Sequence, residues 1–290
     1  MTLPLDLPVV DHHCHLSPNG EGVAAARRFR RAGGTHLFLT TQAYGPGPIE
    51  ALGTYEQQFE TTERLAKTIH AETGVVVYLV VAPYPVDLVA ASKTLGVPGA
   101  LDLHRSALDL AGRWVHEGRA VAVGEVGRPH FPVDPEIRVA CDEAFVHALD
   151  VARDAGCPAV VHSEDLDDGA RAELTRLALS VEFPLHRLVK HYQRTLLAAD
   201  AGPGAVPSYL ARRQLCAATL ERPGPWFWET DFLDDSRRPG AVLDIETVPR
   251  RALAAAAKTS DSLERLRVPF VTSVESVYGF RPNAEEVGHP

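Results

Sequence analysis

The 290-residue sequence lacks the features that mark a membrane or secreted protein. No apolar run approaches the roughly 18 residues that a transmembrane helix needs, which argues against a membrane-spanning class. The N-terminus has no basic region followed by an apolar stretch, so we expect no secretion signal. The cysteines are few and show no CxxC spacing: Cys14, Cys141, Cys157 and Cys216. We therefore expect reduced thiols in a cytoplasmic protein rather than a disulfide framework.

Positive charge is also scarce. The chain has 29 basic residues against 38 acidic ones, for a net charge of −9. This balance argues against a protein that grips nucleic acid through a broad basic face, although it permits a small phosphate pocket. The length and the 45% hydrophobic content are typical of one soluble α/β barrel. We expect a single domain over residues 1–290, with no membrane association and no obligate protein partner.

A short apolar strand followed by a helical stretch repeats along the chain. The expected strands cover residues 8–16, 36–40, 75–81, 120–126, 159–162, 188–191, 216–220 and 226–229. The seventh of these, 216–220, is weakly marked. Eight strands with interposed helices predict an α/β fold of the (β/α)8 TIM-barrel type, regular or distorted, and such barrels place their chemistry at the carboxyl ends of the strands.

The first expected strand carries a histidine-rich stretch, residues 11–15. Strand alternation places Asp11, His13 and His15 on one face, and His12 and Cys14 on the other. Two residues of a strand advance roughly 6–7 Å, so two imidazoles at this spacing can converge on one ion. Hydrogen-bonded core histidines explain this stretch equally well when it is taken alone.

Other groups able to bind a metal stand at the ends of four further strands: Glu125, His162, His191 and Asp231. A carboxylate inside an apolar run such as residues 121–127 costs several kcal/mol unless it is paired or bound to metal. The alternative for Glu125 is a salt bridge in the barrel centre, and each histidine alone could be a hydrogen-bonded core residue. Their joint occurrence at strand ends favours a metal site.

Five short motifs occur in an order that resembles the TatD-like metal-dependent hydrolases of the amidohydrolase superfamily, and an archaeal-type branch in particular. Residues 11–16 match the opening D-x-H-x-H-L, 123–127 match I-G-E-I-G and 160–163 match V-I-H-S. His191 corresponds to a further isolated histidine, and residues 229–231 match E-T-D. The resemblance covers nearly the whole chain.

The resemblance implies a hydrolase of the phosphodiesterase or deoxyribonuclease type with one or two divalent ions. His13, His15 and Asp231 would bind one ion, His162 and His191 a second, and Glu125 both. Zn, Mn, Co, Ni or Mg suit such a mixed ligand set. Asp231 and Glu125 would be the catalytic residues, with Asp231 accepting the proton of the attacking water. Asp11 could orient a ligand from behind it.

Two departures from the family pattern bear on the substrate. Glu164 stands where the bacterial nucleases have an arginine after V-I-H-S, and Arg128-Pro129-His130 replaces Leu-Asp-Tyr after I-G-E-I-G. Arg128 could supply the missing cation for a phosphate or be a solvated loop residue. Arg194 could contact an anion or lie on the surface. A small-molecule or nucleic-acid phosphoester is the expected substrate. A small amide, lactone or carboxylic ester and a non-catalytic metal-binding barrel are the alternatives.

Overall fold

The computed structural model describes residues 7–45, 47–198 and 203–288. Its centre is a nine-stranded parallel sheet with the order β8-β7-β6-β5-β4-β3-β2-β1-β9. The strands are β1 Val10–His15, β2 His36–Thr40, β3 Val76–Val81, β4 Ala122–Gly127, β5 Ala159–His162, β6 Leu188–Gln193, β7 Val206–Leu210, β8 Phe227–Glu229 and β9 Phe232–Leu233.

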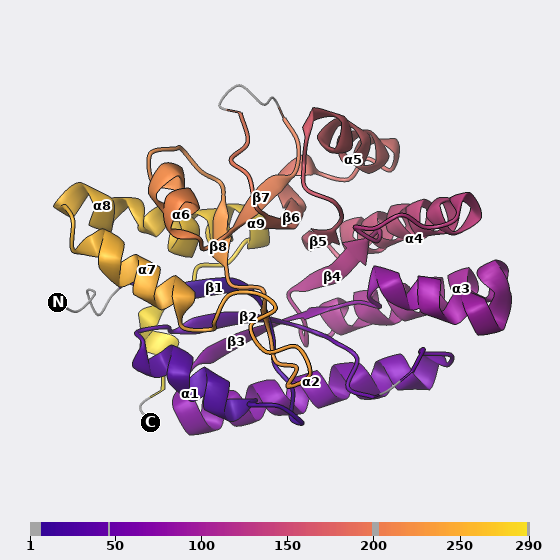
Figure 1. The fold of residues 1–290 in the computed structure, drawn as a ribbon, viewed down its shortest axis with the longest axis horizontal. Helices are drawn as coiled ribbons and strands as arrows, with labels where there is room; N and C mark the ends of the chain where they lie inside the picture. The colour runs from indigo at the N-terminus through magenta and orange to yellow at the C-terminus, as the bar shows by residue number, and fades with distance from the viewer. Residues whose placement is uncertain (1–6, 46, 199–202, 289–290) are drawn as a thin grey trace.

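Helices surround this curled sheet (Figure 1). The α-helices are α1 Val23–Arg31, α2 Leu52–Thr73, α3 Pro85–His116, α4 Pro135–Asp154, α5 Asp168–Ser180, α6 Arg213–Thr219, α7 Thr247–Ala256, α8 Ser260–Arg265 and α9 Ser273–Tyr278. Short helical turns lie at Leu185–Arg187, Val268–Thr272 and Ala284–Glu286. Neighbouring helices from α1 to α5 pack against one another in sequence order around the sheet, and α7 packs against α6, α8 and β1. No helix in the described part of the chain is long and apolar enough to span a membrane.

The sheet closes into a barrel because β8 and β9 behave as one interrupted strand. Its first part, β8, pairs with β7, where Glu229 lies opposite Leu210. Its second part, β9, pairs with β1, where Phe232 lies opposite Cys14. Between the two parts, the backbone N–H of Asp231 donates to the carbonyl of His13 at 2.9 Å. The predicted TIM-type barrel is confirmed, with its seam at the first and last candidate ligands.

The predicted seventh strand is wrong. Residues 216–220 lie in and just after α6, and the true β7 is Val206–Leu210. Alanine-rich Cys-Ala-Ala-Thr has the higher propensity for helix, whereas Pro207 removes a donor and disguises a strand in the sequence. The error leaves the number of barrel strands unchanged, because the strand moves to a neighbouring segment.

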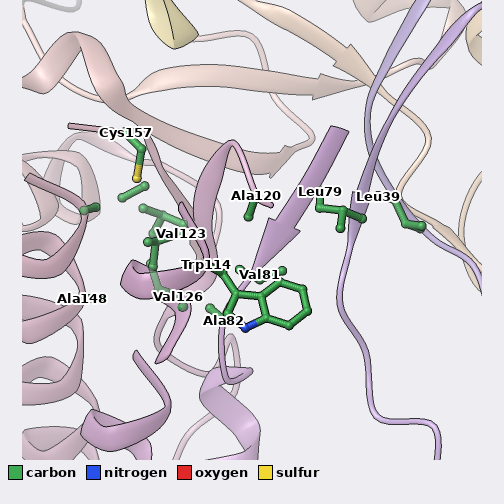
Figure 2. Close-up of a cluster of buried hydrophobic side chains, with 14 of the residues drawn as sticks. Leu39, Leu79, Val81, Ala82, Trp114, Ala120, Val123, Val126, Ala148 and Cys157 are labelled. Carbon is green, nitrogen blue, oxygen red and sulfur yellow. The ribbon is translucent and has the colours of Figure 1, made fainter. Parts of the chain in front are cut away.

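Two apolar layers hold the strands in place. Leu37 and Leu39 point outward into the layer between sheet and helices, while Phe38 points into the barrel interior, as strand alternation requires. Figure 2 shows part of the outer layer, where Trp114 of α3 joins the side chains of β3 and β4. Fully burying one aliphatic side chain of this layer, such as Val81 or Val123, contributes about 1.5–3 kcal/mol to folding. The strands that carry the polar groups are therefore held in place by apolar packing on both faces.

Candidate metal centre

His13 and His15 lie at the end of β1 with their Nε2 atoms 3.2 Å apart. Both rings are held from behind by Thr40 of β2. Its hydroxyl lies 3.3 Å from His13 Nδ1, and its carbonyl accepts from His15 Nδ1 at 3.2 Å. Because the Nδ1 atoms are occupied, the Nε2 lone pairs of both rings face the same point, as metal-ligating histidines require.

Two carboxylates face the same point. Glu125 Oε2 lies 3.8 Å from His13 Nε2 and 3.6 Å from His15 Nε2. Asp231 Oδ1 stands at 3.8 Å and 3.6 Å from the same two nitrogens. Tetrahedral ligands bound at about 2.1 Å lie about 3.4 Å from one another. The donor atoms of His13, His15 and Asp231 are therefore close enough together to hold one small divalent ion, and those of His13, Glu125 and His191 form a second such group.

The second oxygen of Glu125 faces a second pair of histidines. Oε1 contacts His162 Nδ1 and lies 2.7 Å from His191 Nε2, and those two nitrogens are 3.1 Å apart. The His191 ring also stacks on His13, with centroids 4.1 Å apart, so the two groups adjoin. The structure thus brings together all six residues that the sequence singled out as ligands.

Irregular backbone aims three of these side chains. The pairing register shifts in β1 between Asp11 and Cys14, in β4 between Gly124 and Val126, and in β6 between Lys190 and Gln193. His13, Glu125 and His191 lie within these shifts. Bulges of this kind redirect a side chain at the rim of a barrel. Asp231 adds a fourth break, since its φ of 50° lies in the left-handed region.

The shift in β1 overturns the strict alternation expected for His12 and Cys14. The His12 ring stacks on Phe227 at 3.8 Å inside the barrel, and its Nε2 lies 2.8 Å from the Tyr278 hydroxyl. The Cys14 thiol instead donates to the carbonyl of Phe38 and packs in the outer layer. The two side chains therefore occupy opposite faces, although both lie outside the cluster of donor atoms.

Electrostatics favour a cation at the centre of the cluster. Burial raises the pKa of Glu125, but His191 and His162 more than offset this and hold that pKa well below its usual range. Burial lowers the pKa of His191, but the Glu125 carboxylate outweighs it and raises the value to about 10. Burial holds the pKa of His13 well below its usual range. An anionic Glu125 and a neutral His13 are the ionisation states that a metal ligand needs, and a metal ion bound at His191 would replace the proton that His191 holds beside Glu125.

The Asp11 side chain contacts Thr230, at the junction between β8 and β9, rather than an imidazole ring. Its carboxylate accepts the backbone N–H of Thr230 at 2.9 Å and the Thr230 hydroxyl at 2.6 Å, in a fully buried setting. Burial raises the pKa of Asp11 to about 8. Since Thr230 directly precedes Asp231, Asp11 positions that candidate ligand through the backbone. Its predicted orienting role thus has a structural route.

Glu229 was missed among the site residues, although it lies in the E-T-D motif. Its fully buried carboxylate accepts the backbone N–H of Tyr192 at 2.6 Å, and the same oxygen lies 3.5 Å from His191 Nδ1. A carboxylate behind a ligating histidine orients the ring and raises its basicity. The available signal was the strand period of two, which places residue 229 on the same face as 231.

Neither interpretation of Arg128 applies. Its side chain is 1% exposed, and its guanidinium donates to Glu164 at 2.6 Å, to Glu173 at 2.7 Å and to Asp142 at 3.4 Å. It is therefore neither a solvated loop residue nor a cation free to bind phosphate. Glu164, in turn, directs its charge to Arg128. Arg194 is half-exposed and pairs with Asp165 at 2.8 Å, which agrees with the surface interpretation.

Two further side chains contact the cluster at His162. His130 Nδ1 lies 2.9 Å from His162 Nε2, and the Tyr84 hydroxyl lies 3.3 Å from the same nitrogen. The sequence carried no signal for Tyr84, which follows β3 and begins α3. His130 stood within a departure from the family pattern. Only the fold places either residue beside His162.

The family model described as TatD-related DNase matches residues 10–279. The chain belongs to the TatD family. An uncharacterized protein of the archaeon Methanocaldococcus jannaschii is 30% identical over 247 residues, which cover 84% of this chain and 86% of that protein. This relative agrees with the resemblance to an archaeal-type branch. Membership of this family identifies the protein as a hydrolase. Its buried His, Glu and Asp side chains form a candidate metal site.

Solved structures of low sequence identity share the fold. A TatD-like protein from Archaeoglobus fulgidus is 18% identical with a TM-score of 0.59, covering 89% of this chain and all of that one. A TatD homologue from Escherichia coli is 16% identical with a TM-score of 0.60, covering 93% of this chain and 98% of that one. The phosphotriesterase homology protein of E. coli was solved with phosphate in its active site. It is 12% identical with a TM-score of 0.59, covering 95% of this chain and 99% of that one. These likenesses establish a TIM-type barrel for the TatD-family chain.

Proposed function

We propose that this protein is a two-metal hydrolase that cleaves a phosphoester bond in a small substrate. In this proposal His13, His15 and Asp231 hold one divalent ion, His162 and His191 hold the second, and Glu125 holds both. The observation that carries it is the placement of Glu125, whose two oxygens face two separate pairs of histidines. A carboxylate in that position is suited to bridging two ions.

The donor set suits Zn, Mn, Co or Ni, and Mg if waters complete its shell. Divalent ions at such a centre lower the pKa of water and neutralise charge at the displaced oxygen. In this proposal Asp231 accepts the proton of the attacking water, a role supported by its 16% exposed side chain and by its Oδ1, which faces His13 and His15. Glu125 remains an anion through its contacts with His162 and His191. Asp11 and Glu229 hold Asp231 and His191 in orientation.

The preference for a small phosphoester rests on the charges beside the centre. Arg128 and Arg194 are paired with carboxylates, and Lys190 is buried and donates to the carbonyl of His191. A nucleic-acid backbone needs several cations for its phosphates. A single phosphoryl group could instead be bound by the ions themselves. The phosphate in the active site of the E. coli phosphotriesterase homology protein supports a phosphoester substrate.

The same pairing of cations favours a second candidate, a hydrolase of a small amide, lactone or carboxylic ester. Such a substrate carries no negative charge at the reacting group, so it needs no free arginine. For either candidate we place the protein in the cytoplasm. The four cysteines are free and buried, which agrees with a reducing compartment.

The test compares metal-loaded wild type with Glu125→Gln on bis(p-nitrophenyl) phosphate, single-stranded DNA and simple lactones. We expect phosphodiester turnover by the wild type. In Glu125→Gln we expect turnover to fall at least 100-fold and bound metal to fall below that of wild type. The exposed residue Glu143, which pairs with Arg105, supplies the matched control Glu143→Gln. Turnover of lactones alone would favour the second candidate, and wild-type metal content in Glu125→Gln would refute the centre.

A further inference from the structure

His162 offers a different ring nitrogen to each of two neighbours. Its Nδ1 faces Glu125 and lies 3.1 Å from His191 Nε2, while its Nε2 lies 2.9 Å from His130 Nδ1. A neutral imidazole carries one proton, and the nitrogen without it is the one that can bind a metal. The partner of Nε2 therefore decides whether Nδ1 is available to an ion.

We propose that His130 is a positioning residue of the second metal group. His130 Nδ1 accepts the Nε2–H of His162, which leaves His162 Nδ1 as the ligand atom beside His191 Nε2 and Glu125 Oε1. This inference rests on the metal centre of the proposed function. Hydrogen-bond partners of this kind typically change metal affinity by 10–100-fold, because they fix both the tautomer and the ring orientation.

The segment that carries His130 is fastened to the strand that carries His162. The backbone N–H of Arg128 donates to the carbonyl of His162 at 3.0 Å. The Arg128 guanidinium donates to Glu164, which lies two residues beyond His162. Arg128 thus anchors the segment at both its backbone and its side chain. The pairing of Arg128 with Glu164 accounts for both departures from the family pattern, since together they hold His130 in place.

Among the described residues, His130 has one competitor for the Nε2–H of His162. The Tyr84 hydroxyl lies 3.3 Å from that nitrogen, farther than His130 Nδ1 at 2.9 Å. His130 is an exposed residue, and its ring meets the Phe131 ring edge-on, with centroids 5.4 Å apart. The shorter contact and the anchored segment assign the larger effect to His130. Tyr84→Phe is therefore expected to change metal affinity less than His130→Ala.

The experiment titrates metal-free protein with zinc in the presence of a competing chelator. We expect two equivalents in the wild type. His130→Ala should weaken the binding of the ion held by His162 and His191, the second equivalent, 10–100-fold. The affinity for the other ion, the first equivalent, should stay within twofold of wild type. His130→Asn should restore the second to within about threefold, because asparagine Oδ1 can accept a hydrogen bond at the place of Nδ1. His147, a surface histidine paired with Asp109, supplies the control His147→Ala.

A spectroscopic readout accompanies the titration. Long-range proton–nitrogen correlation spectra of zinc-loaded, histidine-labelled protein should show His162 protonated at Nε2. Protonation at Nδ1 would overturn the inference, as would an unchanged second equivalent in His130→Ala or a failure of His130→Asn to restore it. Circular dichroism confirms that each variant is folded. If Glu125→Gln loses metal as expected while His130→Ala binds both ions normally, this inference alone fails and the proposed hydrolase stands.

Discussion

Asp234 offers a sharp test of how the strand ends are held together. Its carboxylate accepts the backbone N–H groups of Ser17 and Gly22 on Oδ2, at 2.9 Å and 2.8 Å, and that of Glu21 on Oδ1 at 2.7 Å. Its own N–H donates to the carbonyl of His15 at 3.0 Å. Asp234 therefore ties the chain after β9 to the loop between β1 and α1, directly beyond a candidate metal ligand.

The expected magnitude follows from these three bonds. A hydrogen bond from an N–H to an ionised carboxylate contributes about 1.5–3 kcal/mol. Water can replace the bond to Glu21, which is exposed, so Asp234→Ala should lower the free energy of unfolding through the other two, by about 3–6 kcal/mol. Asp234→Asn keeps an acceptor for Ser17 and Gly22 but turns an amide donor toward the Glu21 N–H. We expect it to cost about 1–3 kcal/mol.

The assay is urea unfolding of metal-free protein, followed by circular dichroism. The free energy of unfolding should decrease from wild type to Asp234→Asn and again to Asp234→Ala. Asp109→Asn removes an exposed carboxylate that pairs with His147, and it should leave that free energy unchanged. A loss below 1 kcal/mol in Asp234→Ala would refute the reasoning, because it would mean that the loop needs no acceptor. If Asp234→Ala does not fold, Asp234→Asn still tests the order.

Two further predictions concern buried charge. Burial raises the pKa of Asp87 from 3.8 to about 7, so between these values the folded protein keeps a proton that the unfolded chain releases, and stability falls as pH rises. From pH 5 to pH 8 the wild type should therefore lose about 2–3 kcal/mol of unfolding free energy relative to Asp87→Asn, and parallel urea-unfolding profiles would contradict this. Arg128→Met should cost about 2–3 kcal/mol in the same assay, less than a fully buried pair, because Glu164 and Glu173 can be rehydrated. It should also weaken the second zinc equivalent, and a stability equal to wild type would rule out an anchoring role.

The sequence predicted the barrel and singled out its candidate ligands because both depend on local patterns. Apolar segments at regular spacing indicate strands wherever they occur, and His13, Glu125 and His191 stand out as polar groups at the ends of such segments. The prediction failed at Pro207, where a strand contains a residue that strands usually avoid. The register shifts around His13, Glu125 and His191 left no signal, because a bulge arises from the pairing of two strands rather than from one.

The sequence by itself determined the fold class, the family and the types of donor atoms at the strand ends. Only the tertiary structure decided which atoms converge. It directed one oxygen of Glu125 to each histidine pair, placed Asp231 at the closing seam and engaged Arg128 with carboxylates from other segments. It also brought His130 against His162, which is 32 residues away in the chain. The physical reason is that alternation and propensity act within a strand, whereas ligand geometry and charge pairing act between strands.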